Sequence, residues 1–225
     1  MKYAVLFALL LAHGPGEIFD RVVASVDGRA ITRLELDRAV LTGGLARENG
    51  ESDETHRGRV LAEMIDDYLR YRDAERFAPA PPAAREIDDA YRALRERLVR
   101  EGKDPDLEFR AAGMSEPEVR GSLEKQLVVR RYIQDRIVSL VMISPEEIQA
   151  AYEGPFAEAY RREGRPAPPL DGVRETIRED LRNRKINAEL EKWTQDLRAK
   201  ARIRILGEGP PLGPRKPVVV TKVPG

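Results

Sequence analysis

Apolar residues recur every three or four positions along most of the chain, which is the spacing of amphipathic helices. In residues 57–77 this stripe predicts a helix with one face in the core. The same spacing predicts helices over residues 33–47, 105–113, 115–141 and 171–201, one that ends before Gly102 and one that begins after Ser144. A mainly helical fold follows. The stripe in residues 57–77 consists of Val60, Leu61, Met64, Ile65, Tyr68 and Leu69.

Three short segments have the pattern of strands instead. Residues 21–26 and 29–32 contain β-branched residues, and they flank Asp27-Gly28, a strong signal for a type I′ hairpin turn. Residues 202–206 alternate charged and apolar side chains, as a half-buried strand does. Because a two-stranded hairpin is barely stable alone, we expect the late strand to pair with the early hairpin.

Capping signals mark the starts of several predicted helices. Thr32, Ser115 and Ser144 are each followed three positions later by a glutamate, which is the capping-box pattern. Asp104 precedes Pro105, and proline is favoured in the first turn because its missing N–H would have had no partner there. Pro-rich stretches at residues 78–82 and 164–169 interrupt the helical pattern.

The N-terminus has the layout of a secretory signal peptide. Lys2 precedes an apolar run over residues 3–12, and small residues follow up to Gly16, where we expect cleavage. Ten apolar residues are too few to span a bilayer, and the chain has no cysteine to carry a lipid. The mature protein is therefore expected to be periplasmic or otherwise exported, without stable insertion in a membrane.

These signals divide the chain into three parts. Residues 1–16 form the expected signal peptide. Residues 17–206 form one domain, which the helix over residues 171–201 and the strand over residues 202–206 complete. Residues 207–225 are rich in proline and glycine and are expected to form a disordered tail.

Composition argues against several kinds of chemistry. The 225 residues contain 39 basic and 39 acidic side chains, so charge alone predicts no nucleic-acid partner. Cysteine is absent and histidine occurs only as His13 and His56, so we expect no catalytic residue, cofactor or metal. His56 falls in a polar loop and is expected to be solvated. The Asp66-Asp67 pair is expected on a solvated helix face.

The order of these signals resembles the N-terminal chaperone region of the SurA family of periplasmic peptidyl-prolyl isomerases and folding factors. The matches cover residues 18–152 together with the final helix and strand. No single motif is specific, but their order and spacing are. The matching stretches are residues 20–24 (DRVVA), 31–37 (ITRLELD), 61–77 (LAEMIDDYLRYRDAERF), 109–116 (FRAAGMSE), 130–133 (RRYI) and 143–148 (ISPEEI).

The resemblance implies a SurA N-terminal or trigger-factor-like helical domain that binds unfolded outer-membrane or secreted polypeptides without ATP. In that family a parvulin-type isomerase domain usually lies before the C-terminal helix. Here only residues 154–171 occupy that place, and eighteen residues are too few for a domain of ~100 residues. The resemblance therefore carries over the chaperone region, and no catalytic residue of a parvulin can be assigned.

Four residues are candidates for contact with a bound polypeptide: Tyr68, Tyr91, Tyr132 and Met142. Aromatic and methionine side chains suit broad apolar contacts, although core packing is the more frequent role of such residues. Two other functions stay open at this stage. One is prolyl isomerisation at an unrecognised site, and the other is a dedicated adaptor for one envelope protein, working through the Pro-rich tail.

Overall fold

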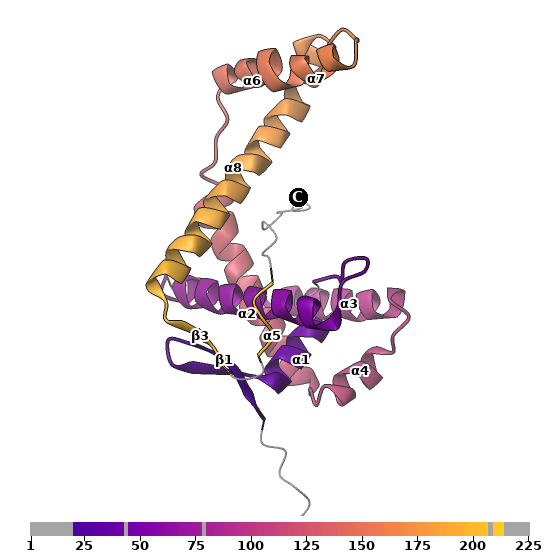
Figure 1. The fold of residues 1–225 in the computed structure, drawn as a ribbon, viewed down its shortest axis with the longest axis vertical. Coiled ribbons are helices and arrows are strands. Elements are labelled where there is room, and N and C mark those ends of the chain that lie inside the picture. The colour runs from indigo at the N-terminus through magenta and orange to yellow at the C-terminus, as the bar shows by residue number, and fades with distance from the viewer. Residues whose placement is uncertain (1–19, 43–44, 78–79, 207–208, 214–225) are drawn as a thin grey trace, which may run out of the picture.

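A small antiparallel sheet joins the two ends of the described chain (Figure 1). The computed structural model describes residues 20–42, 45–77, 80–206 and 209–213. Strands β1 (Val22–Val26) and β2 (Arg29–Thr32) form the expected hairpin, with Asp27 and Gly28 at φ of 51° and 88°. Strand β3 (Ile203–Ile205) pairs with the other edge of β1, so the predicted pairing is confirmed.

Helices account for most of the remaining chain. The small sheet and five of these helices form what we call the body, and π-helix η1 (Gln134–Val138) continues the fifth helix. A second group, α6 (Pro145–Ala151), η2 (Tyr152–Phe156) and α7 (Ala157–Arg162), lies at the far end of α8 (Leu170–Lys200). The helices of the body are α1 (Arg33–Thr42), α2 (Asp53–Glu75), α3 (Ala84–Arg100), α4 (Pro105–Ala111) and α5 (Glu116–Ile133).

Three hydrophobic clusters hold the fold together. The first lies between the sheet, α1 and α2, and the second between α3, α4 and α5. The third joins η1 to the middle of α8. The fully buried members include Val26, Ile31, Leu36, Leu61 and Ile65 in the first cluster, Leu98 and Val119 in the second, and Leu190 in the third.

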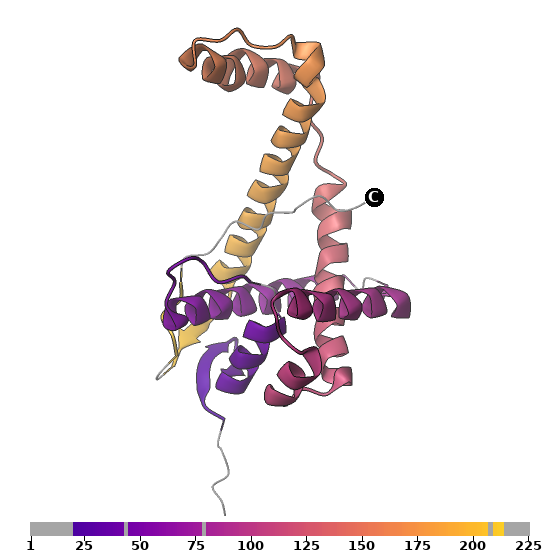
Figure 2. The same ribbon diagram turned by 90° about the vertical axis from the view of Figure 1, so that its right-hand side faces the viewer.

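Helix α8 connects the far end of the molecule to the sheet. Its 31 residues extend about 46 Å at the usual rise of an α-helix. We call α6, η2, α7 and the N-terminal half of α8 the arm, which projects from the body in both views (Figures 1 and 2). Ile148 of α6 and Ile177 of α8 are buried, while Tyr152, Phe156 and Tyr160 stack in a row along the arm.

The start of α2 differs from the expectation. The helix begins at Asp53 rather than near residue 57, because the Ser52 hydroxyl accepts a hydrogen bond from the Thr55 N–H at 3.1 Å and caps it earlier. His56 consequently lies in the first turn and is 4% exposed, so the expected solvated loop position is wrong. Helix α1 is shorter than expected and ends at Thr42.

The capping boxes at Thr32 and Ser144 are confirmed, with hydrogen bonds in both directions to Glu35 and Glu147. At Ser115 the geometry differs, because both the N–H and the hydroxyl of the serine donate to the Glu118 carboxylate. Helix α5 nevertheless begins at the next residue. Local sequence therefore places these helix starts correctly even where one hydrogen bond differs.

The C-terminal segment also departs from the expectation. Disorder is predicted from residue 207 onward, yet residues 209–213 lie against the start of α2, and Pro210 is buried. The remainder of the predicted tail falls outside the described residues, as does the predicted signal peptide.

Removing residues 202–225 should lower the free energy of unfolding, because β1 loses its second partner and part of the first cluster is uncovered. Urea unfolding of the shortened and full chains measures this effect. Arg204→Ala is the control, since the Arg204 side chain is exposed and the substitution keeps the backbone pairing. An unchanged midpoint in the shortened chain would contradict the structural role of β3.

Candidate polypeptide-binding surface

The four candidate residues do not come together in one place. Tyr68 lies on α2 near the hairpin, and Tyr91 lies on α3 in the second cluster. Tyr132 lies in the last turn of α5, where this helix meets α2 and α8. Met142 follows η1 in the connection to α6. Tyr132 and Met142 both border the junction between body and arm, so they are the pair considered further.

Tyr68 and Tyr91 are half-buried and serve packing. The guanidinium groups of Arg29 and Arg72 lie 4.8 and 5.6 Å from the centre of the Tyr68 ring. Tyr91 stacks on Phe109 with ring centres 6.1 Å apart, and Arg120 covers it at 4.6 Å. Cation–π contacts stabilise such rings in place. Both rings are therefore held on more than one side by the protein itself.

Tyr132 is the middle of an aromatic row that sequence reasoning did not single out. Its ring centre lies 5.4 Å from that of Phe77 and 5.0 Å from that of Trp193. Phe77 is 52% exposed although it is a large apolar residue, and Arg136 lies over its ring at 5.0 Å. We call Phe77, Tyr132 and Trp193 the aromatic row. Phe77 lies in the turn after α2, Tyr132 on α5 and Trp193 on α8. Because these segments are far apart in the sequence, no local pattern could predict the row.

Polar contacts fix the orientation of the aromatic row. The Trp193 indole N–H donates to Asp73 at 3.0 Å, which anchors α8 to the end of α2. Burial, and then the Asp73 charge, raises the pKa of Tyr132 above its ordinary value. Half-buried Ile133, Ile137 and Val141 continue the apolar surface from the row along η1.

The connection from η1 to α6 exposes the two most accessible large apolar residues of the described chain. Leu140 is 71% exposed and Met142 is 82% exposed. The segment is nevertheless held in place, because Arg182 donates to the Val138 carbonyl at 3.1 Å and Lys185 donates to the Met142 carbonyl at 3.3 Å. Both donors belong to α8. The exposure therefore belongs to a fixed segment at the base of the arm.

An ionic seam attaches α8 to α2 beside the aromatic row. Asp66 is 1% exposed and pairs with Arg198, which also donates to the Ala62 carbonyl at 3.1 Å. Burial raises the pKa of Asp66, and the Arg198 charge acts in the opposite direction. Arg70, also buried, donates to the Thr194 hydroxyl at 3.0 Å. The expectation that Asp66 is solvated is therefore wrong, because α8 covers that face of α2.

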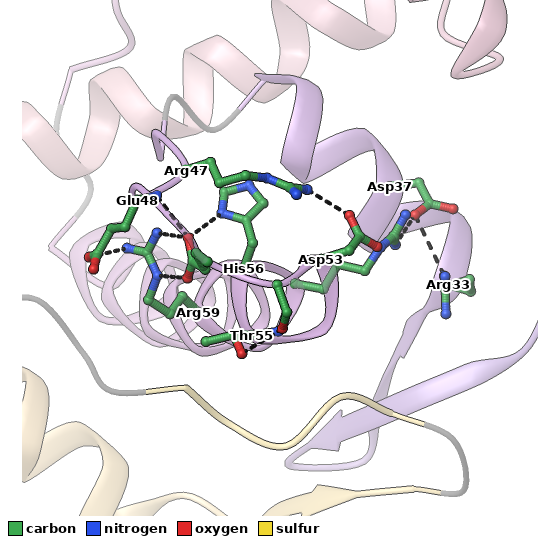
Figure 3. Close-up of polar contacts among 11 residues, drawn as sticks. Arg33, Asp37, Arg47, Glu48, Asp53, Thr55, His56 and Arg59 are labelled. Atoms are coloured by element: carbon green, nitrogen blue, oxygen red, sulfur yellow. Dashed lines mark hydrogen bonds and ion pairs between the residues drawn. The ribbon is translucent and has the colours of Figure 1, made fainter.

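A second polar network fixes the loop before α2 (Figure 3). Arg59 is buried and donates to both carboxylate oxygens of Glu51 at 2.6 and 2.7 Å, and to the Ala46 carbonyl at 3.0 Å. His56 Nδ1 lies 3.5 Å from the same carboxylate. The hydrogen bonds from Arg59 lower the pKa of Glu51 to about 2. These contacts fold the loop over the start of α2.

The described residues assemble neither a metal site nor a membrane span. Within these ranges no three histidine or acidic side chains are grouped as metal ligands. None of the described helices is long and apolar enough to cross a bilayer. What the surface offers chemically is apolar and aromatic contact, fixed by hydrogen bonds from α8.

Breaking the seam should destabilise the protein. Asp66→Ala leaves Arg198 partly buried without its carboxylate, so we expect a loss of about 3 kcal/mol, the lower end of the range for broken buried pairs. Asp180→Ala removes an exposed pair on the same helix and should cost under about 1 kcal/mol. Urea unfolding followed by fluorescence of Trp193, the single tryptophan, measures both. Equal losses would contradict the role of the seam.

The Glu51–Arg59 pair should make stability depend on acid. Glu51 has an ordinary pKa of 4.5 in the unfolded chain and about 2 in the fold. Its stabilising effect is therefore complete above about pH 4.5 and is lost as the pH falls toward 2. Urea unfolding between pH 5 and pH 2.5 should show a shallower decline for Glu51→Gln than for the original chain. Glu96→Gln, on the exposed face of α3, should keep the original slope; parallel curves for all three would refute the assignment.

Comparison of the chain with protein-family models gives no match, and comparison with curated proteins gives none either. The functional interpretation of this surface therefore depends on its own geometry and on the resemblance seen in the sequence.

Proposed function

We propose that this protein is an ATP-independent chaperone of the periplasm that binds unfolded outer-membrane or secreted polypeptides. The aromatic row is the observation that supports this function best. Phe77 is half exposed at one end of the row, beside Tyr132 and Trp193. Large apolar groups in exposed, fixed positions are typical of surfaces that bind other proteins.

The chemistry of the surface suits weak and varied contacts. Aromatic faces interact with many side chains, and a pair of aromatic rings contributes about 0.5–1.5 kcal/mol beyond its buried area. Met142 adds a flexible, polarisable side chain that can adapt to different partners. Several such contacts along one extended segment add up, so a client would be held by avidity rather than by one specific pocket.

The arm carries a second group of aromatic rings away from the body. Tyr152, Phe156 and Tyr160 form a second row there, with ring centres 5.7 and 5.1 Å apart. The Tyr152 hydroxyl donates to the Pro168 carbonyl at 2.8 Å and fixes its end of this row. A long unfolded segment could contact both rows in turn. Client binding through two separated groups of aromatic rings fits holding better than catalysis at one point.

The proposal is tested by the aggregation of an unfolded outer-membrane protein, followed by light scattering. A molar excess of this protein should slow aggregation. Phe77→Ala should weaken the effect about twofold to twelvefold, since it removes one aromatic contact worth about 0.5–1.5 kcal/mol. The substitution should leave the fold intact because the ring is half exposed.

Leu107→Ala is the matched control. Leu107 is 57% exposed, close to the value for Phe77, but lies on α4, which packs against α3 rather than α8. The Leu107→Ala variant should slow aggregation of the unfolded outer-membrane protein as much as the original chain does. Failure of the original chain to slow aggregation would overturn the chaperone function, and equal losses from both substitutions would overturn the role of the aromatic row.

A further inference from the structure

Residues 209–213 form a short segment, here called the strap, that crosses from the sheet to α2. Its entry is fixed by two backbone hydrogen bonds of 3.0 Å: Leu206 N–H donates to the Val23 carbonyl, and Gly209 N–H donates to the Leu206 carbonyl. Pro210 is buried, whereas Leu212 is 38% exposed. The strap is thus a proline-containing segment seated on the protein, not a free end.

The seat on α2 is shaped for close backbone contact. A Cβ added to Gly58 would lie well inside 3.0 Å of the Pro211 carbonyl oxygen, and its three nearest atoms all belong to the strap. A Cβ on Gly213 would lie 2.6 Å from Arg59 Cγ. Side chains at either position would separate the two surfaces. The contact therefore requires glycine on both the helix and the strap.

Apart from the contact with the strap, glycine at position 58 is unfavourable for the stability of α2. Glycine within a helix costs about 1 kcal/mol relative to alanine, because it loses more backbone entropy on folding. Gly121 of α5 is a useful contrast, since a Cβ there would meet nothing within 4 Å. The strap is the structural feature that excludes a side chain at Gly58.

Arg59 makes this seat rigid. Its guanidinium is bound by Glu51 and by the Ala46 carbonyl, so the aliphatic part of the side chain under Gly213 cannot easily move away. Figure 3 shows Arg59 projecting from the start of α2 toward the loop that holds it. The seat therefore has a fixed shape that accepts an extended backbone.

We propose that the strap seat, formed by Gly58, Arg59 and Val23, is a binding site for extended proline-rich segments of other polypeptides, occupied in cis by the strap. Proline restricts a segment to extended conformations, so little entropy is lost when it binds. The cis strap acts at an effective concentration of the order of millimolar, and a foreign segment has to compete with it. This inference goes beyond the chaperone function and does not depend on it.

The test uses a fluorescein-labelled peptide with the sequence of residues 207–216, GEGPPLGPRK, and a labelled proline-rich peptide, PPGPPPGPPP, which keeps glycine at the places of Gly209 and Gly213. Both are titrated by fluorescence anisotropy. In the full chain, Pro210→Ser with Pro211→Ser weakens the strap and should tighten binding of both probes at least tenfold relative to the original chain. Adding Gly58→Ala to this variant should abolish binding. Adding Gly121→Ala instead should leave binding unchanged.

Equal binding by the original and strap-weakened chains, no binding by either, or binding that tolerates Gly58→Ala would overturn the proposal. Binding of the chain's own sequence but not of PPGPPPGPPP would restrict the seat to exchange between copies of this protein, and would overturn the assignment to foreign segments. Hydrogen exchange gives an independent measurement on otherwise unaltered chains. Gly58→Ala should speed exchange of the Gly209, Leu212 and Gly213 amides and Gly121→Ala should not; unchanged exchange in both would contradict the seat.

Discussion

The pairing of β3 with β1 is the constraint on which the rest of the structure depends. It places Arg202 against Asp27, where the two residues exchange a backbone hydrogen bond and a side-chain hydrogen bond at 3.0 and 2.8 Å. Helix α8 ends two residues before β3 and is thereby fixed over α2. Because α8 also carries Trp193, the position of the aromatic row follows from the sheet at the C-terminal end of this helix.

The contacts between α8 and α2 combine apolar packing with paired charges. Leu197 packs on the first cluster, while Asp66 and Arg198 pair beside it. A buried charge pair does not guarantee stability, since desolvation offsets much of the attraction, but it strongly disfavours arrangements that leave one charge alone. The seam thus specifies how α8 lies on α2, and this in turn sets the position of Trp193 in the aromatic row.

Local sequence predicts the helices and strands of this fold, whereas it does not predict the candidate polypeptide-binding surface. The Asp27-Gly28 turn, the caps at Thr32 and Ser144, and the apolar stripe of α2 each depend on neighbours a few residues away, so the sequence predicts them well. Burial of Asp66 depends on Arg198, far along the chain, so local sequence does not predict it. The expected position of His56 is wrong because Ser52 caps α2 before the apolar stripe begins. The aromatic row requires the end of α2, α5 and α8 to be positioned first.

The late arrival of β3 bears on how the protein folds. During synthesis, β1 is made long before its second partner, so the first cluster lacks Leu197 and Ile203 until the chain has been extended through β3. Contacts between such distant segments form slowly because a long loop has to close first. Folding is therefore delayed, and until β3 pairs with β1 the polypeptide stays accessible to the machinery that handles nascent chains.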